Sequence, residues 1–226
     1  MRQATALHPA QKRARLSAMD LSTGRWLHQP SAFDVSDQAV SITTEPHTDF
    51  WQRTYYGFRN DNAPALLFEH NTNFTFTTRA SFSYRGRFDQ CGILLHVDSE
   101  NWCKIAVEAE TDELARLGSV VTNNGHSDWA TTDIAPVAQI WFRVSQRGPD
   151  FLIESSSDGR RFTQMRIFHL HALGTTTAAI GKQDPPEAPQ HSVRFGVFAC
   201  SPMDASFSAT FDRFGLTDSQ WPVHQG

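Results

Sequence analysis

The side chains best suited to chemistry in this sequence are concentrated between Phe88 and Trp129. Within residues 102–109, an apolar set alternates with a set that contains a tryptophan, a lysine and a glutamate. Because successive side chains of a β-strand point to opposite faces, the second set shares one face of its strand. An aromatic ring beside both signs of charge is more typical of a ligand-binding surface than of a solvated strand. The apolar set is Cys103, Ile105, Val107 and Ala109, and the other set is Trp102, Lys104, Ala106 and Glu108.

A sugar-binding surface needs aromatic rings for the apolar side of the sugar and planar polar groups for its hydroxyls. Several strand-like segments offer such side chains on the face that is not expected to enter the core. A surface ion-pair network of Lys104, Glu108 and Arg143 is the alternative interpretation. The predicted ligand-binding residues are Gln90, His96, Trp102, Lys104, Glu108, Trp129, Trp141 and Arg143, with Trp51 as a further aromatic candidate.

Glu108 and Lys104 are the catalytic candidates, in case the same face carries out a reaction. Glycoside hydrolysis uses two carboxylates about 5 to 9.5 Å apart, and the strand of Glu108 offers only Glu110 as a second one. A lysine and a glutamate together suit proton abstraction or isomerisation instead, with Lys104 as the acid or base. Three other carboxylates, those of Asp89, Asp98 and Asp128, could reach Glu108 only through folding.

No cofactor or metal is predicted. His169 and His171 have a spacing that metal sites use, but no cysteine or acidic cluster accompanies them. The sequence also lacks a phosphate-binding glycine loop and a dinucleotide-binding fingerprint.

Composition excludes several classes of partner. The 226 residues carry a formal net charge of −4, so no basic face is expected for nucleic acid. No apolar run approaches the ~20 residues that span a bilayer, and no secretory signal opens the chain, which predicts a cytoplasmic protein without a membrane partner. The three cysteines, Cys91, Cys103 and Cys200, are expected to be buried thiols.

The hydrophobic pattern predicts about a dozen strands and no long helix, hence two stacked sheets or a barrel. The clearest strand is 74–84, and 90–97 and 102–110 are expected to form a hairpin around a four-residue turn. Further strands are expected at 39–43, 117–122, 139–144, 151–155, 162–170, 194–199 and 207–214. Residues 1–20 are expected to form a flexible tail, 21–217 a single β-sandwich domain and 218–226 a C-terminal tail. The long proline-bearing loop from 174 to 191 is either a functional cover or a mobile segment.

A set of short motifs occurs in a recognisable order along the chain. The motifs are Asp49-Phe50-Trp51, Asp89-Gln90 with Gly92, Trp102-x-Lys104 with Glu108, Ser119-Val120-Val121-Thr122, Ser127-Asp128-Trp129, Ser157-Asp158-Gly159 and Ser201-Pro202. Together they resemble the DUF1349 family, also called the regulation-of-enolase-like family. The resemblance covers residues 26–216 and implies an all-β, concanavalin A-like jelly-roll β-sandwich of two antiparallel sheets, with one concave face available to ligands. It implies no particular reaction.

Together these observations predict a protein that binds a small polar ligand, a carbohydrate or sugar derivative, on the concave face. One alternative is a carbohydrate-active enzyme (a hydrolase, lyase or isomerase) that uses the same face. Another is a regulatory protein that binds a metabolic enzyme, as the family's second name suggests. The expected partner is a sugar-like small molecule, and the question of a homodimer stays open.

Overall fold

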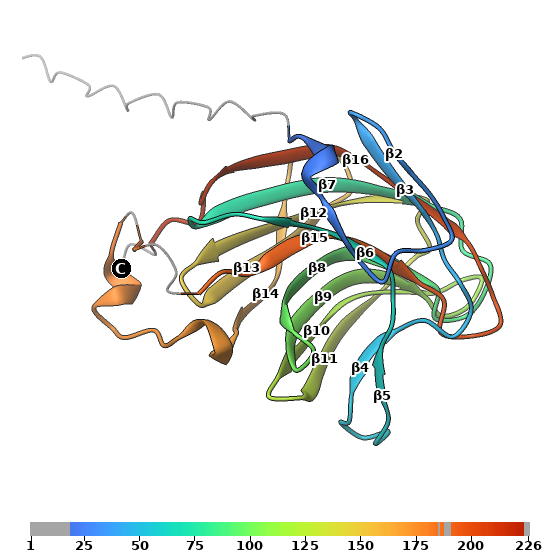
Figure 1. The fold of residues 1–226 in the computed structure, drawn as a ribbon, viewed down its shortest axis with the longest axis horizontal. Coiled ribbons are helices and arrows are strands. Elements are labelled where there is room, and N and C mark those ends of the chain that lie inside the picture. Colours follow the sequence, from blue (N-terminus) through green and yellow to red (C-terminus); the bar gives the residue numbers. More distant parts are fainter. Residues whose placement is uncertain (1–18, 185, 188–190, 224–226) are drawn as a thin grey trace, which may run out of the picture.

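The computed structural model describes residues 19–184, 186–187 and 191–223. Two seven-stranded antiparallel sheets stack face to face (Figure 1), which confirms the predicted jelly-roll β-sandwich. Three one-turn 3-10 helices, Leu21–Thr23, His171–Leu173 and Ile180–Lys182, are the helical elements of the described chain. None of the described helices is long and apolar enough to cross a membrane.

The first sheet carries the stretch that the sequence singled out. Its strands, in spatial order, are β1 (Arg25–Leu27), β6 (Ala65–Glu69), β15 (Arg194–Cys200), β8 (Gln90–Asp98), β9 (Asn101–Ala109), β10 (Ala115–Asn123) and β11 (His126–Ile134). The β8–β9 hairpin matches the predicted one to within a residue or two at each end. Strand β11 lies partly in a segment that the sequence presents as turn-rich.

The second sheet packs against the inner face of the first. In spatial order it contains β14 (Thr163–His169), β13 (Asp150–Ser156), β12 (Gln139–Arg147), β7 (Phe74–Phe82), β16 (Ser208–Asp218), β3 (Ala39–Thr43) and β2 (Ala32–Val35). The alternating phenylalanines of β7 are buried between the sheets, as their period of two predicts.

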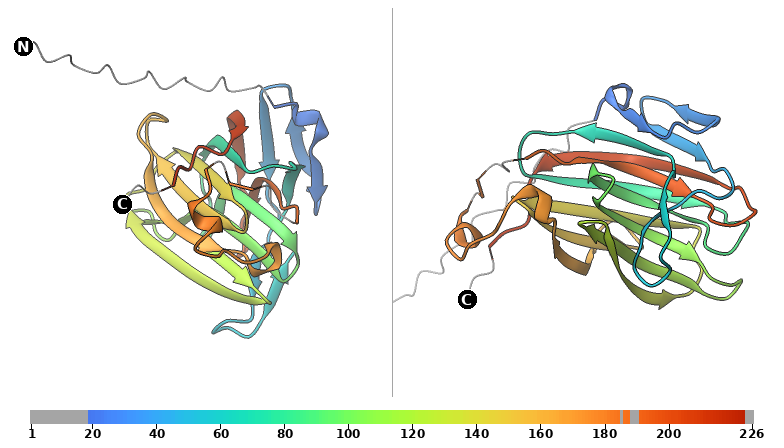
Figure 2. Two further views of the ribbon diagram at one scale, coloured as in Figure 1. Left: turned by 90° about the vertical axis from the view of Figure 1, so that its left-hand side faces the viewer. Right: turned by 60° about the horizontal axis from the view of Figure 1, so that its bottom comes forward.

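A small two-stranded sheet, β4 (Phe50–Gln52) with β5 (Arg59–Asp61), forms no strand pairing with either large sheet. In Figure 1 this β4–β5 hairpin extends from the lower right of the molecule, and the right-hand view of Figure 2 places it in front of the green strands. Strand β4 contacts β10 and β11, so the hairpin covers part of the outer face of the first sheet.

A second hydrophobic core forms under this hairpin, separate from the core between the sheets. Phe50 is fully buried there, with its ring centroid 5.6 Å from that of Trp102 and 6.1 Å from that of Phe198. Burying three large aromatic side chains is worth several kcal/mol, on the order of 1.5 to 3 kcal/mol each. This core therefore fixes the hairpin to the sheet.

Side chains on the outer face of the first sheet form rows across β8, β9 and β10. In one row Glu108 lies between Gln90 and Arg116, and in a parallel row Lys104 lies between Leu94 and Val120. The row between them consists of Gly92, Ala106 and Gly118. A floor of small residues thus separates two rows of larger and charged ones.

Candidate functional site

The β4–β5 hairpin is held in place by hydrogen bonds to two turns of the first sheet. Gln52 donates from its backbone nitrogen to Ser127 Oγ (2.9 Å) and from Nε2 to the carbonyl of Ser99 (3.0 Å). Arg53 donates to Glu100 Oε1 (3.0 Å) and to the carbonyl of Gly125 (2.7 Å). These contacts tie the end of β4 to the sheet, and Arg59 on β5 also donates to Glu100 Oε1, at 3.0 Å.

A cavity of about 350 Å³ lies between the hairpin and the small-residue floor. This volume is at the lower end of the range for sites that bind small molecules. The cavity is lined by Asp49, Trp51, Tyr56, Phe58, Asn60, Phe88, Gln90, Lys104, Ala106, Glu108, Arg116, Gly118, Ser119, Val120, Trp129, Thr131, Pro202 and Met203.

A buried ion pair joins the floor of the cavity to the start of the hairpin. Lys104 Nζ lies 2.7 Å from Asp49 Oδ1, and the two side chains are only 6% and 14% exposed. The backbone nitrogen of Phe50 also donates to Asp49 Oδ1, at 2.8 Å. Asp49 raises the pKa of Lys104 even though burial opposes the charged form, so the ammonium stays protonated.

Glu108 is the group on the cavity wall that is poised to exchange a proton. Its Oε2 accepts from Gln90 Nε2 at 2.9 Å, whereas its Oε1 is buried without a hydrogen-bond partner among the described residues. Burial raises the pKa of Glu108 to about 7, with Asp49 adding to the effect and Lys104 opposing it. A carboxyl group of this kind can donate or accept a proton near neutral pH.

Arg116 completes the charged row on the far side of Glu108. Its Nε lies 3.4 Å from Glu110 Oε2, and its guanidinium carbon lies 5.5 Å from the ring centroid of Trp129. The guanidinium is therefore balanced by a carboxylate and rests against an aromatic face.

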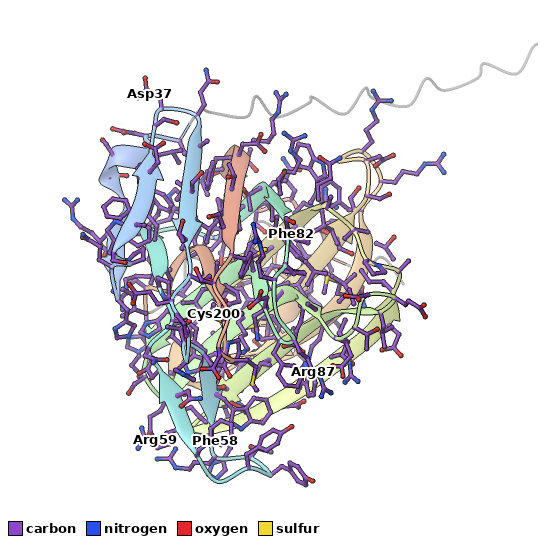
Figure 3. All side chains as sticks on the ribbon, turned by 90° about the vertical axis from the view of Figure 1, so that its right-hand side faces the viewer. Asp37, Phe58, Arg59, Phe82, Arg87 and Cys200 are labelled. Carbon is purple, nitrogen blue, oxygen red and sulfur yellow. The ribbon has the colours of Figure 1, made fainter. Side chains whose placement is uncertain are left out.

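An aromatic wall closes the other side of the cavity. Trp129 is 39% exposed, and Trp51 packs edge-on against it with ring centroids 6.4 Å apart. Tyr56 and Phe58 stack on each other at the hairpin tip, with centroids 5.3 Å apart. Figure 3 shows Phe58 and Arg59 on the protruding hairpin, far from Asp37 at the opposite end of the molecule.

Two residues near the cavity have left-handed backbone conformations that non-glycine side chains rarely adopt. Phe88 has φ 69° and Tyr55 has φ 63°. The loop before Phe88 is held by Asp89, whose Oδ2 accepts from the backbone nitrogens of Arg85 and Gly86, each at 2.8 Å. Strained backbone of this kind concentrates at functional sites, where the surroundings enforce it.

The structure brings five of the nine predicted ligand-binding residues to the cavity. They lie on β4, β8, β9 and β11 and are Trp51, Gln90, Lys104, Glu108 and Trp129. Both catalytic candidates, Lys104 and Glu108, are among them.

Trp141 and Arg143 do not belong to this face, and their predicted position is wrong. Strand β12, which carries both, is in the second sheet. Trp141 packs over Gly159 there. Arg143 forms a bidentate ion pair with Glu154, from Nε to Oε2 (2.6 Å) and from Nη2 to Oε1 (2.8 Å). Strand parity identified their face correctly as non-core, but it could not tell which sheet the strand would join.

Trp102 and His96 have the predicted parity but do not line the cavity. Trp102 is fully buried beneath Phe50, and its indole nitrogen donates to the carbonyl of Ser99 at 3.3 Å. His96 is 4% exposed and accepts from Arg194 at 2.9 Å. Burial and the arginine lower the pKa of His96 to about 4, so this imidazole is neutral. Both residues therefore act in packing.

Asp49, Arg116, Tyr56 and Phe58 line the cavity but were not predicted as site residues. One feature of the sequence points to Asp49 as a site residue: it begins the Asp49-Phe50-Trp51 motif of the family resemblance. The pairing of Asp49 with Lys104 spans 55 positions, which no local pattern reveals.

The remaining sequence candidates lie elsewhere. Both ring nitrogens of His169 are engaged, Nδ1 with Asp150 (2.7 Å) and Nε2 with the carbonyl of Gly174 (3.1 Å). Within the described residues, no group of three histidine, cysteine or acidic side chains is arranged to hold a metal ion. The described part of the 174–191 loop contacts the residue before β7 of the second sheet, where Asn73 donates to the carbonyl of Glu187 at 2.6 Å. Pro185 and residues 188–190 of that loop are outside the described chain.

Comparison with known proteins yields one family and one curated relative. A family described as "Protein of unknown function (DUF1349)" matches residues 26–219. Regulation of enolase protein 1 of Saccharomyces cerevisiae is 32% identical over 199 residues, covering 88% of this chain and 91% of the yeast protein.

Solved structures show the same fold. A functionally unknown protein from Saccharomyces cerevisiae superposes with a TM-score of 0.76 at 30% identity, covering 90% of this chain and all of that one. A xylan β-1,4-xylosidase from Bacillus halodurans gives 0.62 at 12% identity, covering 96% of this chain and 41% of the xylosidase. An alginate lyase from Klebsiella pneumoniae gives 0.52 at 11% identity, covering 83% and 84% of the two chains. The last two similarities establish the fold alone.

Proposed function

The chain belongs to the DUF1349 family, and we propose that it binds a small polar ligand, a carbohydrate or sugar derivative, in the cavity beneath the β4–β5 hairpin. The observation that carries this proposal is the pairing of an aromatic wall with buried, incompletely satisfied polar groups. Trp129 offers a ring face, while Glu108 Oε1 lacks a partner within the described residues. A buried acceptor without a partner is costly, and a ligand hydroxyl would satisfy it.

A second candidate, a carbohydrate-active enzyme, is favoured by the environments of two carboxylates. Asp49 forms an ion pair with the Lys104 ammonium at 2.7 Å, whereas burial raises the pKa of Glu108 to about 7. One cavity therefore holds an ion-paired carboxylate and a carboxyl group that can exchange a proton near neutral pH. A pair of carboxyl groups in different environments is the pattern found in acid–base hydrolysis.

A third candidate, regulation of a metabolic enzyme by direct binding, rests on the name of the yeast relative and on the hairpin tip. Tyr55 is 92% exposed and Tyr56 54% exposed. Exposed tyrosines are enriched in protein interfaces because they offer contact area with little loss of side-chain freedom.

A binding titration, monitored by saturation-transfer NMR, tests the leading proposal. The probes are the methyl glycosides of glucose, galactose, mannose and xylose, measured against the native protein and against Ala106→Phe. The added ring would occupy the cavity from its floor, so binding should be lost without unfolding. Ala32→Leu, at an exposed position of β2 in the second sheet, is the matched control and should bind like the native protein.

Two results would refute the proposal. The first is that none of the four glycosides, and none of their charged derivatives, binds the native protein. The second is that a glycoside binds the native protein and Ala106→Phe equally, which would place its site elsewhere.

A further inference from the structure

We propose that the cavity selects an uncharged, hydroxyl-rich ring over anionic or cationic sugar derivatives, an inference that rests on the proposed function. It narrows the ligand class from sugar derivatives in general to neutral sugars. It follows from how the charges of the cavity are balanced and from which polar atoms they leave free.

Each of the two cationic side chains that line the cavity already has a carboxylate beside it. Lys104 Nζ is 2.7 Å from Asp49 Oδ1, and Arg116 Nε is 3.4 Å from Glu110 Oε2. An anionic ligand would have to share each cation with a carboxylate that is already there. Sites that bind phosphate or carboxylate tightly instead present donors without competing acceptors.

The atoms left free in the cavity include both donors and acceptors. Lys104 makes one hydrogen bond within the described chain, to Asp49, which leaves two of its three N–H groups available. Asp49 uses only Oδ1 for hydrogen bonds to described residues, so its Oδ2 is free to accept. Glu108 Oε1 and Gln90 Oε1 are further acceptors without a partner in the described chain.

Hydroxyl groups match such a mixed set because each can donate and accept at the same time. A carboxylate or phosphate on the ligand would face the free oxygen of Asp49 without a proton to offer it. An ammonium group would face Lys104 and Arg116. Either charge therefore meets a group of its own sign, whereas a neutral polyol meets none.

The aromatic wall adds a non-polar requirement. The exposed face of Trp129 and the stacked pair of Tyr56 and Phe58 border the same cavity. One face of a pyranose ring consists largely of C–H groups. This apolar face packs against the aromatic side chains better than a heavily charged molecule does.

The experiment compares matched ligands at pH 7. Each methyl hexoside is titrated beside its uronate, its 6-phosphate and its 2-amino-2-deoxy analogue, and methyl xyloside, which has no C6, is titrated beside its 2-amino-2-deoxy analogue alone. We expect each charged analogue to bind at least about tenfold more weakly than its neutral parent. A uronate, phosphate or amino sugar that binds as tightly as the neutral ring would overturn the inference and leave the proposed function standing. Absence of binding by any neutral or charged probe would refute the proposed function itself, and the inference with it.

Asp49→Asn provides a second, independent measurement. The amide keeps an acceptor for the backbone nitrogen of Phe50 but removes the negative charge beside Lys104. We expect the uronate to gain about tenfold in affinity relative to the neutral glycoside, because the ammonium then has no carboxylate to neutralise it. A purely structural role of Asp49 would change both affinities together, and that outcome would contradict the charge-balance argument. The control is Asp37→Asn, which makes the same change of net charge at an exposed position remote from the cavity.

Discussion

Lys104 on β9 and Asp49 at the start of the hairpin form an ion pair, with Nζ and Oδ1 2.7 Å apart and both side chains largely buried. The pair links the middle of the first sheet to the segment that covers it. Taking two charges out of water is costly, so each partner depends on the other for compensation. Removing one partner should therefore cost far more than removing an exposed ion pair.

The first prediction concerns stability. Lys104→Met should lower the free energy of unfolding by about 3 kcal/mol, because it leaves the largely buried Asp49 carboxylate without its ammonium partner. Chemical denaturation measures the loss. Arg59→Met is the control, because Arg59 is 48% exposed and Glu100 keeps its pair with Arg53; it should cost less than about 1 kcal/mol. Equal losses in the two variants would show that the buried pair contributes no more than a surface one.

The second prediction concerns pH. Burial raises the pKa of Glu108 to about 7 in the folded protein, from an ordinary value of 4.5. The folded state therefore holds this proton more tightly than the unfolded chain, and the stability it contributes is present below pH 4.5 and lost as the pH rises to about 7. The Glu108→Gln variant has no carboxyl group to titrate and does not lose this stability as the pH rises. The free energy of unfolding of the variant, minus that of the native protein, should therefore increase by about 3 kcal/mol between pH 4.5 and 8.

Denaturation curves at a series of pH values test this difference. Glu113→Gln, at an exposed position of the turn between β9 and β10, is the control. Its stability relative to the native protein should stay constant over the same range. A Glu108→Gln difference that is flat with pH would show that Glu108 titrates normally.

The sequence predicts the β8–β9 hairpin and its two faces because alternation is a local property of the chain. This rule places Lys104 and Glu108 on the outer face, and both line the cavity. The same rule places Trp141 on a non-core face, but pairing between distant strands decides which sheet that face belongs to. Local parity therefore identifies a face and not its neighbours.

Trp102 illustrates a second limit of sequence analysis. Its strand and its face were predicted correctly, yet it is fully buried because Phe50 lies over it. The cover comes from a hairpin about 50 positions earlier in the chain, held by contacts such as Gln52 to Ser127. Whether an outer face is open or covered is set by such long-range contacts, which no periodicity records.

The third prediction separates the two tryptophans that the sequence treated alike. Trp129→Ala should weaken binding of any ligand of the cavity by about tenfold, because a ring face is lost from the wall. Trp141→Ala should leave the affinity unchanged, because Trp141 packs over Gly159 on the second sheet. The same NMR titration measures both variants. A loss of affinity in Trp141→Ala would place the ligand on the second sheet, and an unchanged affinity in Trp129→Ala would contradict the role of this ring in the wall of the cavity.

The last prediction concerns Phe88, which lines the cavity in a left-handed backbone conformation with φ 69°. Phe88→Ala and Phe88→Gly remove the same ring, but only glycine adopts this conformation without steric cost. The glycine variant should therefore be more stable than the alanine variant by about 1 kcal/mol, although glycine usually destabilises a fold. Both variants should bind the ligand more weakly than the native protein. Chemical denaturation of the two variants side by side measures this difference. An alanine variant of equal or greater stability would contradict the prediction and would mean that the loop relaxes to another conformation once the ring is gone. In that case the phenylalanine ring, through its contact with the cavity, would itself hold the backbone in the strained conformation.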